Sequence, residues 1–91
     1  MAGIEISAMY QEIEEPIEVL AVFQNGKIKP LSFKWKSKVY KVAKVTSHWS
    51  APVGKYKWHH FGIIDKDDNF FEICYDEEKC SWNIKQSWKE E

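Results

Sequence analysis

The dipeptide Asn25-Gly26 constrains the fold of this chain more than any other feature of its sequence. It lies between two β-rich runs, and both of its residues tolerate the positive φ angles of a tight two-residue hairpin turn. Such a turn places Phe23 opposite Ile28. It also places Ala21 opposite Pro30, which has no N–H to donate to a sheet ladder, so we expect a bend or a sheet edge there.

Runs of alternating apolar and polar residues continue along the chain, and turn signals separate them about every eight to twelve residues. The phase slips between Val42 and Val45, which predicts a bulge near Ala43-Lys44. We expect a loop over residues 50–54 and a left-handed Asn69 in a later turn. The fold class is therefore all-β, a small antiparallel barrel or strongly bent sheet of about six strands. The predicted strands are residues 17–23, 31–36, 39–49, 55–64, 70–75 and 81–88.

A chain of 91 residues forms one domain, which we assign to residues 17–88. Residues 1–16 are predicted to be an N-terminal extension with two open alternatives. Ile4 and Ile6 alternate as in an added strand, whereas residues 8–15 equally fit a short helix. Neither a signal peptide nor a membrane-spanning run is recognisable, so we expect a cytoplasmic protein with reduced thiols that does not contact a membrane.

The charges of the chain are unevenly distributed. Between Glu18 and Asp65 there is no acidic residue, yet this stretch holds nine lysines and eight aromatic residues. The chain has no arginine, so it lacks the bidentate fork that reads guanine edges, and we expect diffuse contact with a phosphate backbone instead. Exposed rings between such lysines could stack on single-stranded bases. The candidate nucleic-acid-binding residues are Lys34, Lys36, Lys38, Lys41, Lys44, Trp49, Lys55 and Lys57.

The same residues also have structural interpretations. Lysines keep strand faces soluble and blunt sheet edges. The phase of Trp35 and Trp58 places them with the core, whereas Trp49 is expected to be exposed. Exposed rings could also form a cage for a methylated lysine or a peptide. We therefore predict a non-enzymatic binding module for single- or double-stranded nucleic acid without sequence specificity. The alternative is a protein-interaction or oligomerisation module that uses exposed aromatics or an open strand edge.

No recognised catalytic or metal-binding motif is present. The chain lacks a phosphate-binding loop, a dinucleotide fingerprint and a nucleophile elbow, so we expect no enzyme and no cofactor. Zinc ligands usually come in close pairs, but His59 and His60 are adjacent and point to opposite faces of a strand, so we expect no metal site. Cys74 and Cys80 flank an acidic turn, and whether they pair is open.

Several short motifs follow one another over roughly residues 15–88. They are Glu15-Pro16-Ile17-Glu18-Val19, Phe33-Lys34-Trp35, Val39-Tyr40-Lys41-Val42, Trp49, Trp58-His59-His60-Phe61, Phe71-Glu72-Ile73-Cys74-Tyr75-Asp76 and Ser81-Trp82-Asn83-Ile84. Their order resembles a small bacterial family of unknown function. Members of that family occur alone or as segments at the tail of polymerase-like DNA-damage-tolerance proteins. The resemblance implies a small β-barrel and a tie to DNA transactions, and it carries no catalytic or binding residues to transfer.

Overall fold

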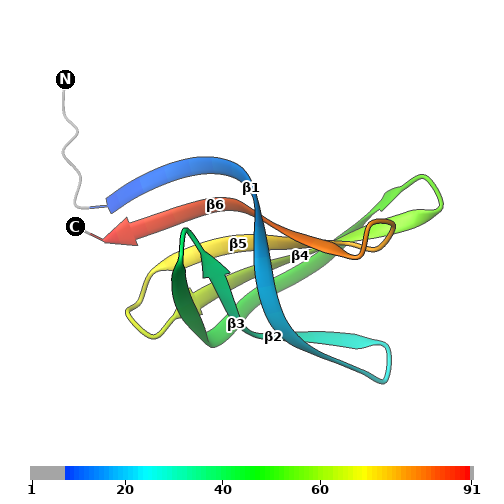
Figure 1. Ribbon diagram of the computed structural model, residues 1–91, viewed down its shortest axis with the longest axis horizontal. Coiled ribbons are helices and arrows are strands. Elements are labelled where there is room, and N and C mark those ends of the chain that lie inside the picture. The colour runs from blue at the N-terminus through cyan, green and yellow to red at the C-terminus, as the bar shows by residue number, and fades with distance from the viewer. Residues whose placement is uncertain (1–7, 91) are drawn as a thin grey trace.

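The structure, a computed structural model, describes residues 8–90, and it describes the burial of residues 12–88. These residues form six antiparallel strands that close into a barrel in chain order, which confirms the all-β prediction (Figure 1). β1 begins at Ala8, so the helix predicted as one alternative for residues 8–15 is wrong. The alternation at Ile4 and Ile6 lies outside the described residues. The strands are β1 (Ala8–Gln24), β2 (Lys27–Trp35), β3 (Lys38–Val53), β4 (Tyr56–Asp65), β5 (Phe70–Asp76) and β6 (Ser81–Glu90).

Two long strands each take part in two sheets, and this sharing closes the barrel. Residues 8–17 of β1 pair with β6, whereas residues 18–24 pair with β2. In β3, residues 38–41 pair with β2 and residues 42–53 pair with β4. The smaller sheet therefore consists of the second part of β1, β2 and the start of β3. The larger sheet consists of the start of β1, β6, β5, β4 and the rest of β3.

The predicted hairpin register is confirmed. Asn25 and Gly26 have φ angles of 52° and 75°, and Phe23 pairs with Ile28. Ala21 pairs with Pro30, and the pairing slips there, because the ladder is irregular between Leu20 and Ala21. The predicted bulge near residues 43–44 is also confirmed, and a second irregularity follows between residues 45 and 47.

Two turn predictions are wrong. Residues 50–53 continue β3 and pair with β4, so the turn is confined to Gly54 and Lys55. Pro52 is tolerated because this part of β3 pairs only with β4 and forms a sheet edge. In the β4–β5 turn the left-handed residue is Asp68, with a φ of 65°. Asn69 instead donates its N–H and its side-chain amide to the Asp65 carboxylate.

The barrel core joins side chains from both sheets. Phe71 is fully buried, and its ring centroid lies 5.1 Å from that of Phe33 and 5.0 Å from that of Tyr40. Trp35 is buried beside them, as predicted, and its Nε1 donates a hydrogen bond to Glu15 at 2.8 Å. Trp58 does not enter the core, because the neighbouring positions His59 and Phe61 of β4 face the interior.

Candidate functional site

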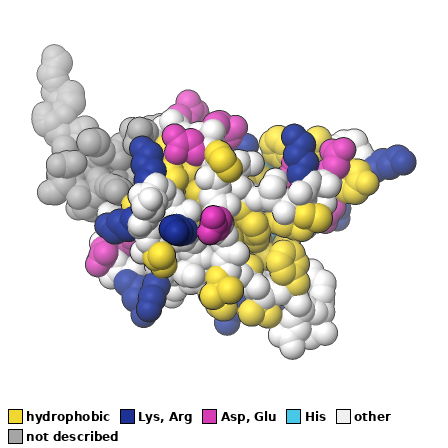
Figure 2. Space-filling model, in the orientation of Figure 1, with side chains coloured by type: hydrophobic (Ala, Val, Ile, Leu, Met, Phe, Trp, Pro, Cys, Tyr) yellow, Lys and Arg dark blue, Asp and Glu magenta, His cyan; other side chains and the backbone are white. Residues whose placement is uncertain are grey.

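The predicted nucleic-acid-binding residues do not gather on one surface. Lys34 and Lys41 project from the outer face of the smaller sheet. Lys44 and Trp49 lie on the outer face of the larger sheet, and Lys55 and Lys57 lie at the tip of the β3–β4 hairpin. The remaining two lysines lie near the β2–β3 turn. Lys36 Nζ lies 4.9 Å from the ring centroid of Trp35, and Lys38 Nζ lies 5.1 Å from that of Tyr40. Figure 2 shows basic side chains scattered among acidic and hydrophobic ones.

The outer face of the smaller sheet combines aliphatic and basic side chains. Leu20, Val22 and Val39 are 64%, 41% and 57% exposed. The pairing register puts lysines next to them: Val39 lies opposite Lys34, and Val22 lies opposite Lys29. We call this surface the lysine-bordered face. It consists of Leu20, Val22, Val39, Lys27, Lys29, Lys34 and Lys41.

A shallow depression of about 240 Å³ lies within this face, lined by Leu20, Ser32, Lys34, Val39 and their neighbours. Ser32 is the middle residue of a cross-strand row that runs from Leu20 to Lys41. Because its side chain is small, the larger side chains around it stand above the floor of the sheet. The depression therefore offers space for an apolar side chain of a partner.

The outer face of the larger sheet is aromatic where the β3–β4 hairpin leaves the barrel. Trp49 lies opposite His60 and stacks on it, with centroids 5.1 Å apart and planes 4° apart. Trp49 is 45% exposed, as the sequence predicted. Trp58 lies on the same face, and Lys85 Nζ sits 4.7 Å above its ring. These rings are on a different sheet from the lysine-bordered face, so the two do not form one platform.

A polar chain connects β4, β5 and β6 beneath Trp49. His60 Nδ1 lies 3.0 Å from Glu72 Oε2, and Cys74 Sγ lies 3.8 Å from His60 Nε2. Gln86 donates to the other carboxylate oxygen of Glu72. The order thiol, imidazole and carboxylate is that of a nucleophile, its base and an orienting group. Sequence reasoning missed this chain because the three residues meet only through the register of β4 and β5.

The environment of Cys74 does not suit a nucleophile. The side chain is 2% exposed, and burial, reinforced by nearby carboxylates and opposed by Lys85, raises the pKa of the thiol to about 11. The thiol is therefore protonated at neutral pH and shielded from solvent. We interpret the chain as a structural hydrogen-bond network that satisfies the buried Glu72 carboxylate.

The two cysteines differ in burial, and this difference predicts how their thiols react in the folded protein. Both cysteines are free, and Cys80 is exposed. We expect one thiol per chain to react rapidly with a thiol-specific chromogenic reagent under native conditions, and the second to react only after denaturation. Cys80→Ser should have no fast-reacting thiol, and Cys74→Ser should keep it. Two fast-reacting thiols in the native protein would contradict the burial of Cys74.

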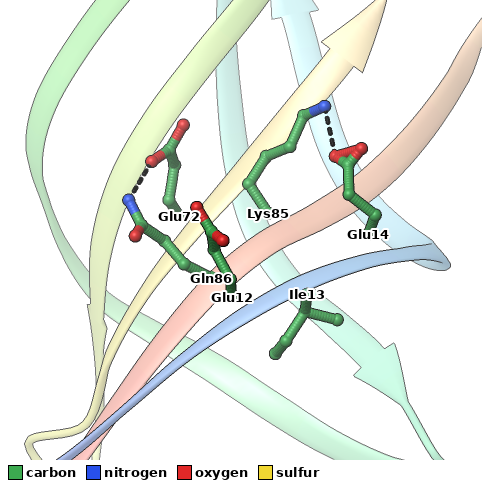
Figure 3. A pocket seen from close by; sticks show the side chains of 6 residues that line it. All are labelled: Glu12, Ile13, Glu14, Glu72, Lys85 and Gln86. Carbon is green, nitrogen blue, oxygen red and sulfur yellow. Dashed lines mark hydrogen bonds and ion pairs between the residues drawn. The ribbon is translucent and has the colours of Figure 1, made fainter.

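Next to this network lies an open depression of about 420 Å³ (Figure 3). Its charged lining is largely engaged internally: Lys85 pairs with Glu14, and Glu72 accepts from Gln86. Across the described part of the chain, no three His, Cys, Asp or Glu side chains are arranged to hold a metal ion. Among residues 8–90, no helix is long and apolar enough to cross a membrane.

Comparison with known proteins adds no assignment. No family model matches the sequence, and no curated protein or solved structure matches it. The resemblance to a bacterial barrel family therefore stays a prediction.

Proposed function

We propose that this protein is a protein-interaction module that binds an acidic, apolar segment of a partner on the lysine-bordered face. The observation that supports this proposal is the exposure of Leu20, Val22 and Val39 on the outer face of one sheet, where Leu20 and Val39 line the same depression across β2. Solvent-exposed apolar side chains that cluster and have a polar rim are typical of interaction surfaces. Burying an apolar side chain on binding supplies most of the affinity, and the depression over Ser32 is a place for one such anchor.

The charges around the patch indicate the chemistry of the partner. Lys27, Lys29, Lys34 and Lys41 surround the aliphatic side chains, and Glu18, which lies opposite Lys34, is the one carboxylate among the described residues that lines the depression. A positive rim favours a negative partner, because complementary charges steer the encounter and exclude partners of like charge. A second copy of the chain docked face to face would bring two sets of these lysines together. The charge therefore favours a different protein over a symmetric dimer.

Nucleic acid is the second candidate, because the same lysines could contact phosphates. A single-strand platform needs basic side chains and stacking rings on one surface. The lysine-bordered face presents aliphatic side chains, and Trp49 lies on the other sheet. Binding through four phosphate contacts would weaken by roughly 50-fold for single strands and roughly 150-fold for a duplex when salt rises fourfold. Binding through the aliphatic side chains should weaken far less.

A displayed library of random peptides, selected on the immobilised protein, tests the proposal. The enriched sequences should combine apolar residues with Asp or Glu. The double variant Leu20→Asp with Val39→Asp should weaken their binding by about a hundredfold or more, because it removes two central contacts and repels an acidic ligand. The matched control is Val53→Asp, an equally apolar exposed residue on the β3–β4 hairpin, which should leave binding unchanged.

Two results would overturn the proposal. One is that no peptide is enriched, or that the enriched peptides bind the double variant and the wild type equally. The other is that labelled single-stranded DNA binds and that this binding weakens steeply as salt rises. In that case Lys34→Glu would abolish the binding, whereas the double variant would not reduce it. The second result would favour nucleic acid.

A further inference from the structure

A separate pocket lies at one end of the barrel, between the tip of the β1–β2 hairpin and strands β4 and β5. Its volume is about 410 Å³, and Phe23, Ile28, His59, Tyr75 and Glu77 line it together with the turn residues of the hairpin. Figure 1 shows the β1–β2 hairpin and the β3–β4 hairpin extending from this end of the molecule. The pocket uses none of the aliphatic side chains of the lysine-bordered face.

Two aromatic rings form a corner in this pocket. Phe23 and Tyr75 meet edge to face, with centroids 5.3 Å apart and an interplanar angle of 68°. His59 lies against Tyr75, with centroids 6.3 Å apart and planes inclined by 36°. Phe23 remains 56% exposed although its ring contacts that of Tyr75. The corner therefore presents aromatic surface to a ligand from two directions.

The Glu77 carboxylate provides negative charge at the same place. Glu77 Oε2 lies 2.8 Å from His59 Nε2, and Oε1 accepts the Lys57 N–H at 2.9 Å. These hydrogen bonds hold the pKa of Glu77 below its usual value, so the carboxylate is ionised at neutral pH. Each of its oxygens keeps a second lone pair for a ligand.

The basic residue at the rim does not oppose this charge. Lys27 lines the pocket, but it pairs with Gln24, one position out of phase with the pair formed by Phe23 and Ile28. Side chains alternate between the two faces of a strand, so the Lys27 side chain projects from the other face of the hairpin. Among the described residues that line the pocket, the charged side chains that face it are therefore Glu77 and, when protonated, His59, and the Lys57 charge also acts on Glu77.

We propose that this pocket binds an alkylammonium group, such as the side chain of a lysine or a quaternary amine. The faces of Phe23 and Tyr75 attract the cation through their quadrupoles. Ile28 contacts the alkyl part of the ligand, and Glu77 balances its charge. This site is separate from the proposed docking function, because the two share only Lys27 and because the pocket takes a cation instead of an acidic segment.

Titrations with choline and with N-acetyl-lysine amide test the site, using the ring-proton resonances of Phe23 and Tyr75 as the readout. The uncharged carbon isostere of choline is the matched ligand control. Choline should bind more tightly than this isostere by about twofold to thirtyfold. Phe23→Leu, which keeps apolar bulk without a ring, and Glu77→Gln should each reduce choline binding severalfold. Trp49→Leu, which removes a ring on the outer face of the larger sheet, should not change it.

The comparison of ligands and variants decides between the outcomes. Equal binding of choline and its isostere would mean a merely apolar pocket and would overturn the proposal. Absence of binding by both ammonium ligands would also overturn it, as would binding that only Trp49→Leu reduces. Binding of choline alone supports a quaternary amine as the ligand, and binding of both supports a lysine side chain as well. None of these variants changes Leu20 or Val39, so a failure here is separate from a failure of the docking proposal.

Discussion

Replacement of Phe71 by alanine is expected to lower the free energy of unfolding by about 3–5 kcal/mol. Phe71 is fully buried at the point where the two sheets meet, and its ring contacts those of Phe33, Tyr40 and Trp35. The loss combines the transfer free energy of the buried ring, which the variant no longer gains on folding, with the cost of the cavity that remains. Because a small domain has only about 5–15 kcal/mol of stability in total, the variant should unfold at much lower denaturant concentration.

Equilibrium denaturation followed by Trp fluorescence and circular dichroism measures this effect. The matched control is Phe23→Ala, because that ring is more than half exposed near a hairpin tip. It should cost less than half as much as Phe71→Ala. Equal losses in the two variants would show that the interface between the sheets is not the centre of the core.

Asp65→Ala is expected to cost about 2–4 kcal/mol, because the carboxylate organises the β4–β5 turn from a buried position. Asp65 is 3% exposed. Its Oδ1 accepts the N–H groups of Asp67 and Asn69, each at 2.9 Å, and its Oδ2 accepts the Asn69 side-chain amide at 3.2 Å. Removal of the carboxylate leaves these donors without their acceptor.

Asp65→Asn should recover part of this loss, because an amide keeps one acceptor oxygen in the same shape. Native-state hydrogen exchange should become faster at the amides of Asp67 and Asn69 in Asp65→Ala. The control Asp67→Ala changes an exposed side chain in the same turn and should cost less than about 0.5 kcal/mol. A similar loss in both aspartate variants would contradict the role assigned to Asp65.

The parts of the fold that depend on residues close together in the chain could be predicted from the sequence. Asn25-Gly26 defined the hairpin, and the phase slip after Val42 located a bulge. The turn after β3 was misjudged, because Pro52 suggested a loop and only the pairing of the strands shows that it lies at an edge. Trp58 was misplaced for a related reason: both it and His59 are compatible with a core position, and only the register of β4 decides between them.

The candidate sites were harder to predict, because they depend on which strands become neighbours. Alternation correctly directs Lys34 and Lys41 away from the core, but it does not indicate that Trp49 of the same stretch joins another sheet. β3 passes from the smaller sheet to the larger sheet after Lys41. Lys41 and Lys44 are close in sequence, but they therefore lie on the outer faces of different sheets. The contact of Phe23 with Tyr75 joins residues about fifty positions apart, and no local pattern indicates it.

Amide chemical-shift mapping with a selected acidic peptide tests the central claim, the docking role of the lysine-bordered face, most directly. We expect the perturbed amides to lie within residues 18–22, 29–34 and 39–41, which belong to the smaller sheet. Perturbations centred on Trp49 and Trp58, or at the pocket around Tyr75, would contradict the claim and place the interaction surface elsewhere on the barrel.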